Sequence, residues 1–134
     1  MSGLALIPIY RYPIGAVSLE FPRGGCEIGE DLETAAVREL REETGLTALS
    51  LRGLGELHAE TGIVDSVTHV FLASVQSTSP PQANPEVTES LSPPVWLLRH
   101  QLVQKISQNH IKCGLTLAAF ALAIAQLEEP VTRT

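Results

Sequence analysis

Hydrophobic and polar positions change their period several times along the chain, and each change marks the boundary of an expected element. Alternating, β-branched or aromatic runs predict strands over residues 4–12, 16–21, 51–57, 68–75 and 95–98. Apolar residues at helical spacing predict helices over residues 31–45, 99–107 and 113–128. Strands interleaved with helices indicate an α/β layered fold, and 134 residues fit a single domain over residues 1–134.

The stretch from Ser77 to Pro94 interrupts this pattern. It is rich in Ser, Thr, Pro and Asn, and it predicts no regular structure. A loop of this length inside a compact domain is usually disordered or a functional lid, so we expect a flexible proline-rich loop over residues 77–94. Trp96, in the short strand that follows, is expected in the core and not as a platform for base stacking.

Composition narrows the class of protein. The net charge of −6 argues against a protein that grips nucleic acid, which needs a basic surface. The N-terminus lacks the basic region and apolar stretch of a signal peptide, and the apolar run over residues 113–125 is far shorter than the ~20 residues that cross a bilayer. Cys26 and Cys113 are too few for a disulfide framework or a zinc site. We therefore expect free thiols in a cytoplasmic protein with no membrane or nucleic-acid partner.

Acidic residues are concentrated in one part of the chain. Eight of the fifteen Asp and Glu residues fall within residues 20–43. On the predicted helix, Glu39, Glu42 and Glu43 stand at i, i+3 and i+4, within about 100° of one another on one face. A hard divalent cation such as Mg²⁺ would relieve the repulsion among three carboxylates. The alternative is a solvent-exposed acidic face that is neutralised by the two arginines of the helix.

The spacing of these residues is more specific than their clustering. From Gly24 the chain reads glycine, five residues, Glu30, seven residues, and then Arg-Glu-Leu-Arg-Glu-Glu-Thr-Gly-Leu over residues 38–46. This matches every fixed position of the Nudix box, so the chain resembles the Nudix hydrolases over residues 24–46. The flanking residues 20–24 (Glu-Phe-Pro-Arg-Gly) are similar to the Glu-Leu-Pro-Ala-Gly segment of the ADP-ribose pyrophosphatase branch, and residues 9–12 resemble the Gln-Tyr-Arg strand of that branch.

The resemblance implies a fold and an activity. It implies a Nudix-type α/β/α sandwich with a mixed β-sheet. It also implies a pyrophosphohydrolase that uses Mg²⁺, or Mn²⁺ in its place, and water to cleave the diphosphate of a nucleoside diphosphate derivative. ADP-ribose or a related sugar nucleotide would be the substrate, and a nucleoside monophosphate and a phosphorylated group would be the products.

The resemblance also assigns roles within the box. Glu39 and Glu43 would be the main metal ligands, with Glu42 in the same cluster and the backbone carbonyl of Arg23 as a further ligand. Glu42 and Glu43 are accordingly also candidate catalytic residues. Metal ions would neutralise the phosphates and activate water.

Other box residues would support the site. Glu30 would pair with Arg38 and hold the loop against the helix. Gly24 and Gly25 suit a loop whose backbone must approach the metal and the substrate closely.

For the candidate site residues outside the box, more than one role is possible. Arg11 and Glu20 would contact substrate, although Arg11 could equally be a cation on the surface of a strand. The general base of the ADP-ribose branch lies on a loop before the last strand. The matching stretch here offers Glu86 and Glu89, with Glu89 slightly preferred. The alternative is that both glutamates only keep the loop soluble.

Two departures from the branch affect the expected substrate and assembly. The chain starts at the arginine-bearing strand, without the N-terminal region that usually precedes it. An open sheet edge favours aggregation, so we expect a homodimer in which the partner covers that edge, or a rearranged sheet. Residues 60–62 (Glu-Thr-Gly) replace a Ser-Pro-Gly step, which weakens ADP-ribose as the specific substrate. The alternatives are a non-catalytic nucleotide-sensing module and a hydrolase of damaged nucleoside triphosphates.

Overall fold

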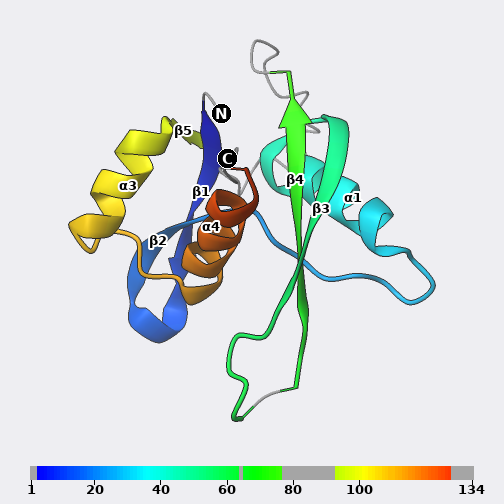
Figure 1. The fold of residues 1–134 in the computed structure, drawn as a ribbon, viewed down its shortest axis with the longest axis horizontal. Helices are drawn as coiled ribbons and strands as arrows, with labels where there is room; N and C mark the ends of the chain where they lie inside the picture. Colours follow the sequence, from blue (N-terminus) through cyan, green and yellow to red (C-terminus); the bar gives the residue numbers. More distant parts are fainter. Residues whose placement is uncertain (1–2, 64, 77–92, 128–134) are drawn as a thin grey trace, which may run out of the picture.

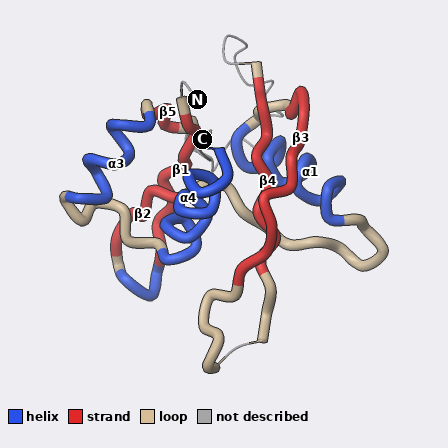
Figure 2. The backbone as a smooth tube through the Cα atoms, viewed as in Figure 1, coloured by secondary structure: helices blue, strands red, loops and turns tan. Residues whose placement is uncertain are grey.

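The computed structural model describes residues 3–63, 65–76 and 93–127, and Figures 1 and 2 show how their elements are arranged. Within these residues the chain forms five strands, three α-helices and one short 3-10 helix. In chain order the elements are β1 (Leu4–Arg11), the 3-10 helix η1 (Tyr12–Ile14), β2 (Ala16–Glu20), α1 (Leu32–Thr44), β3 (Ala48–Leu57), β4 (Thr68–Val75), β5 (Val95–Leu97), α3 (Arg99–Ser107) and α4 (Gly114–Leu127).

The described strands form two separate sheets. One has the order β2-β1-β5, and the other is the ribbon β3-β4. All three strand pairings among the described residues are antiparallel, so the parallel pairing that a mixed sheet requires is not found within them. The register of the β1–β2 hairpin places Ile7 opposite Glu20. Glu20 therefore shares a sheet face with Ile7 and with Arg11, which lies four residues beyond Ile7 on β1.

The apolar core lies between the three-stranded sheet and helices α3 and α4. Its buried members are contributed by β1, β5, both helices and the segment between the helices: Leu6, Leu97, Leu102, Ile111 and Phe120. In Figure 1 these elements form one half of the molecule, and α1 with the β3–β4 ribbon forms the other. The Gln126 side chain of α4 donates a hydrogen bond to the Leu54 carbonyl of β3, which joins the two halves.

Helix α1 begins and ends at polar signals in its own sequence. The Asp31 carboxylate accepts a hydrogen bond from the Thr34 backbone N–H at 2.8 Å. Gly45 ends the helix with a φ of 77°, and its N–H donates to the Arg41 carbonyl at 2.8 Å. The segment from β2 to α1 crosses from one half of the molecule to the other (Figure 1). The structure thereby brings the end of β2 to the acidic face of α1.

Most predicted elements are confirmed, and the differences have physical causes. The strand predicted over residues 51–57 begins at Ala48, because residues 48–50 extend the pairing with β4 across a register shift. The prediction for Trp96 was wrong, since its side chain is 40% exposed at the edge of the sheet. Residues 77–92 of the predicted proline-rich loop lie outside the described residues.

Candidate functional site

Arg38 connects α1 to the loop that precedes it. Its Nε and Nη2 groups donate to the two Glu30 carboxylate oxygens at 2.8 and 2.9 Å, in the bidentate geometry that suits a guanidinium. Nη2 also donates to the Gly25 carbonyl at 2.9 Å. The Arg38 hydrogen bonds lower the pKa of Glu30 to about 2. The structure thus contains the expected Glu30–Arg38 pair, which fixes residues 25–30 against the helix.

The same guanidinium also holds two glutamates of the helix. Arg38 Nη1 donates to Glu39 at 3.1 Å and to Glu42 at 3.0 Å. The Glu42 side chain is 50% exposed, as expected for an i,i+4 partner on a helix surface. Arg38 therefore links Glu39 and Glu42, whereas Glu43 bonds to the loop backbone.

Glu39 and Glu43 lie where the loop backbone meets the helix. The Arg23 backbone N–H donates to Glu43 Oε2 at 2.9 Å. A Cβ atom added to Gly24 would overlap the Glu39 carboxylate as it stands, so the backbone at Gly24 lies directly against this side chain. Burial, and to a smaller extent repulsion by Glu39, raises the pKa of Glu43. The Glu39 and Glu43 carboxylates thus both lie against the Arg23–Gly24 segment, and Glu39 is also paired with Arg38.

Glu20 is buried at the start of this loop. The residue is 2% exposed, and its carboxylate accepts two hydrogen bonds from Arg11, at 2.6 and 2.9 Å. Arg23 Nε lies 3.6 Å from the same carboxylate. The Arg11 hydrogen bonds, more than any other cause, lower the pKa of Glu20 in spite of its burial. A carboxylate without solvent access is unsuited to direct substrate contact, but it fixes the position of Arg11.

Thr116 was not singled out from the sequence, but it holds the loop from the opposite side. Its hydroxyl accepts a hydrogen bond from the Phe21 backbone N–H at 3.2 Å, and the residue is 3% exposed. The signal in the sequence is a lone hydroxyl within the apolar run of residues 113–125. Such a residue must find a hydrogen-bond partner when it is buried. α4 therefore helps to position the segment that contains Arg23 and Gly24.

The donor set fits a cation that keeps open positions for substrate. Within residues 3–63, 65–76 and 93–127, no three or more His, Cys, Asp or Glu side chains are grouped so as to hold a metal ion. The site instead offers the Glu39 and Glu43 carboxylates beside a loop backbone that packs directly onto them. Mg²⁺ is commonly bound by one or two carboxylates together with substrate phosphates, so these residues fit it. The base candidates Glu86 and Glu89 lie outside the described residues.

The comparison with protein families agrees with this geometry. The NUDIX domain model matches residues 9–114. The match covers most of the chain and includes the whole box, and the chain therefore belongs to the NUDIX domain family.

Named relatives place the chain within this family. It is 39% identical over 70 residues to the ADP-ribose pyrophosphatase of Bacillus subtilis (strain 168), an alignment that covers 52% of this chain and 38% of the relative. It is 29% identical over 126 residues to the ADP-sugar pyrophosphatase of Mus musculus, covering 89% of this chain and 58% of the relative. The chain thus spans 38% and 58% of the lengths of these two curated relatives.

A solved structure confirms the fold class. A crystal structure of an ADP compounds hydrolase superposes with a TM-score of 0.80 at 23% sequence identity, and it covers 95% of this chain and 67% of that chain. The expected Nudix-type α/β fold is thereby confirmed. None of the helices in the described part of the chain is both long and apolar enough to span a membrane.

Proposed function

We propose that this chain is a divalent-cation-dependent pyrophosphohydrolase that cleaves the diphosphate of a nucleoside diphosphate derivative with water. The preferred substrate is ADP-ribose or a related sugar nucleotide, and the products are a nucleoside monophosphate and a phosphorylated group. The observation that carries the proposal is that the Glu39 and Glu43 carboxylates both lie against the backbone of Arg23 and Gly24. The names of the two curated relatives support the substrate class.

Within this proposal the Glu39 and Glu43 carboxylates and the Arg23 carbonyl hold Mg²⁺, or Mn²⁺ in its place. The bound cation supplies charge neutralisation of the diphosphate and activation of water. Glu42 stays close to this set through its bond to Arg38, which fixes the orientation of Glu39 as well. Glu30 holds Arg38 in turn, so that the loop and the helix keep their relative position.

Substrate and proton transfer involve residues on either side of the box. Arg11 is the proposed phosphate contact, because its guanidinium is fixed by Glu20 and remains partly exposed. Gly24 and Gly25 let the substrate approach the loop backbone without interference from a side chain. The proposed general base is Glu89, with Glu86 as the alternative, and it would take the proton of the attacking water.

The direct test is a substrate panel with product identification by mass. It contains ADP-ribose, sugar nucleotides, dinucleotides and nucleoside triphosphates, each with Mg²⁺, with Mn²⁺ and with excess chelator. We expect AMP and ribose 5-phosphate from ADP-ribose, with the reaction abolished by chelator. Hydrolysis of nucleoside triphosphates alone would instead identify the chain as a nucleoside triphosphate pyrophosphohydrolase. An inert protein that still binds ADP-ribose would support a sensing module instead.

We also propose a homodimer in the cytoplasm. β2 lies at an edge of the described three-stranded sheet, and Tyr10, Tyr12 and Val17 of its hairpin are exposed. A second copy that covers this edge would bury them. Cys26 and Cys113 are free thiols, in keeping with a reducing compartment. Sedimentation velocity at micromolar concentration should give the dimer, and a stable monomer would contradict it.

A further inference from the structure

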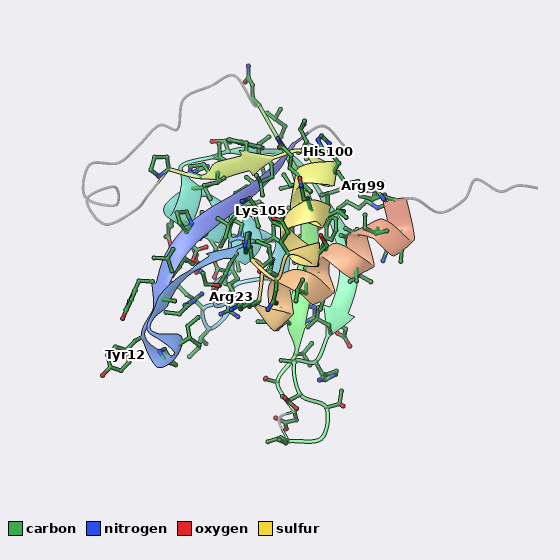
Figure 3. All side chains as sticks on the ribbon, turned by 90° about the vertical axis from the view of Figure 1, so that its left-hand side faces the viewer. Tyr12, Arg23, Arg99, His100 and Lys105 are labelled. Atoms are coloured by element: carbon green, nitrogen blue, oxygen red, sulfur yellow. The ribbon has the colours of Figure 1, made fainter. Side chains whose placement is uncertain are left out.

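Arg23 contributes more than its backbone to the loop beside Glu39 and Glu43. Its N–H donates to Glu43 at 2.9 Å, which places the residue directly next to the proposed metal ligands. Its side chain is 41% exposed, and its Nε lies 3.6 Å from Glu20 Oε1. Figure 3, in which Arg23 is labelled, shows it near the amino-terminal end of α4. The guanidinium therefore lies between the buried Glu20 carboxylate and solvent.

Glu20 has two cationic neighbours and not one. The oxygen that lies 3.6 Å from Arg23 also accepts the 2.6 Å hydrogen bond from Arg11 Nη2. A buried carboxylate is costly unless it is paired, and one guanidinium with two hydrogen bonds already satisfies this one. Arg23 is thus attracted to Glu20 without being needed to neutralise it.

Both guanidiniums keep donors available. Arg11 uses Nε and Nη2 to bind Glu20. In the part of the chain that the structure describes, Arg11 Nη1 and the Arg23 guanidinium have no hydrogen-bond acceptor. Planar guanidinium forks suit phosphate oxygens, and two of them side by side suit a ligand with two adjacent phosphates.

We propose that the Arg23 guanidinium is a second phosphate-binding group of the site, and that Glu20 is the buried residue that positions it beside Arg11. This inference rests on the proposed function, and it makes Arg23 a residue that determines specificity for a diphosphate over a monophosphate. Arg11 and Arg23 bind a diphosphate together, whereas a monophosphate engages only one of them. Glu20 acts through the two arginines and does not touch the substrate.

The test compares Arg23→Ala and Arg23→Lys with the wild-type protein. Arg52→Ala is the matched control, because it removes an exposed arginine from β3. Steady-state kinetics with ADP-ribose and Mg²⁺ give KM and kcat. Calorimetry in excess chelator gives the Kd values of ADP and AMP without turnover. Thermal melting verifies that each variant is folded.

We expect Arg23→Ala to raise KM for ADP-ribose and Kd for ADP by about tenfold or more, because a hydrogen bond to a charged group is lost. AMP affinity should change by less than about threefold, and kcat should stay within about threefold, because the contact serves binding and not the chemical step. Arg23→Lys should recover part of the loss, since it keeps the charge without the fork. Arg52→Ala should match the wild type.

The outcomes separate this inference from the function on which it rests. If the wild type hydrolyses ADP-ribose but Arg23→Ala leaves KM for ADP-ribose and Kd for ADP unchanged to within about twofold, only the role of Arg23 is overturned. An equal loss of ADP and AMP affinity would also overturn it. Wild type that neither hydrolyses ADP-ribose nor binds ADP would overturn both proposals.

The positioning role of Glu20 has its own readout. Glu20→Gln should raise KM for ADP-ribose in the wild-type background and raise it less when Arg23 is already alanine, because part of its effect passes through Arg23. Equal effects in the two backgrounds would contradict that role. If Glu20→Gln does not fold, the Arg23 variants still decide the proposal.

Discussion

Different kinds of interaction stabilise the two halves of the molecule. Under α3 and α4 the contacts are apolar, and Leu6 and Leu102 are completely buried. Between α1 and the loop after β2 the contacts are ionic, and Arg38 alone bonds to three glutamates. The apolar half places the end of β2, through the hydrogen bond between Phe21 and Thr116, beside the ionic half.

This difference implies that the apolar residues mainly determine stability and the charged residues mainly determine activity. An apolar core tolerates exchange of one hydrophobic residue for another of similar size, because its energy depends on buried area and packing. A site made of charges at fixed distances does not, because each group has a particular partner. Substitutions of the buried apolar residues under α3 and α4 should therefore lower the free energy of unfolding, and substitutions of the charged residues between α1 and the loop should lower turnover.

The largest effect is expected from Glu43→Gln. The change keeps the shape of the side chain and its hydrogen bond from Arg23 but removes a ligand charge. Turnover of ADP-ribose should fall by at least about a hundredfold, while the melting temperature changes little. Glu33→Gln, on an exposed position of the same helix, is the control and should be active. A loss below about tenfold in Glu43→Gln would contradict the ligand role.

Leu102→Ala should have the converse effect. Its side chain is fully buried in the core, so its truncation should cost about 2–5 kcal/mol of unfolding free energy in denaturant titrations. The kcat of the folded fraction should stay close to wild type. Val103→Ala, at the exposed neighbouring position, should cost far less. Loss of kcat in folded Leu102→Ala would show that the two halves are not separable.

Thr116→Val tests the connection between the halves. It keeps the volume but leaves the Phe21 N–H without its acceptor, which should cost about 1 kcal/mol of stability. Because the loop then loses one of its fixed points, kcat/KM should fall by roughly tenfold. Thr116→Ser keeps the hydroxyl and should behave nearly like wild type. Equal activity of the valine and serine variants would show that the Thr116 hydroxyl does not position the loop.

The smallest effect concerns acid stability. The pKa of Glu30 is lowered to about 2 by Arg38, from an ordinary value of 4.5. The stabilisation from this pair is therefore complete above about pH 4.5 and is lost as the pH falls towards 2. NMR titration of the Glu30 carboxyl should show the low value, and Arg38→Ala should raise it towards the ordinary one. An ordinary pKa in the wild type would contradict the observed pairing.

Local signals in the sequence were enough to predict α1 and its box. Asp31 and Gly45 mark the two ends of the helix, and the spacing of Glu30 and Arg38 anticipated their pairing. The strand over 68–75 and the helix over 99–107 have the bounds that their patterns predicted. These features depend on residues that are close in the sequence, so the pattern of residue types is enough to predict them.

Features that depend on distant parts of the chain could not be predicted. The burial of Glu20 follows from the register of the β1–β2 hairpin and from coverage by later elements. The role of Thr116 depends on the packing of α4 against the Phe21 segment, and the two residues are 95 positions apart in the sequence. The early start of β3 at Ala48 depends on its partner strand, which overrides the weak local preference of Ser50.

We propose above that Glu39, Glu43 and the Arg23 carbonyl bind one divalent cation next to the diphosphate. Anomalous diffraction from crystals of the wild-type protein grown with Mn²⁺ and AMP tests it most directly. We expect a peak at roughly 2.0–2.2 Å from both carboxylates and from that carbonyl. A protein that turns over substrate with Mn²⁺, but binds the ion elsewhere while Glu43 keeps its bond to the Arg23 N–H, would contradict the claim.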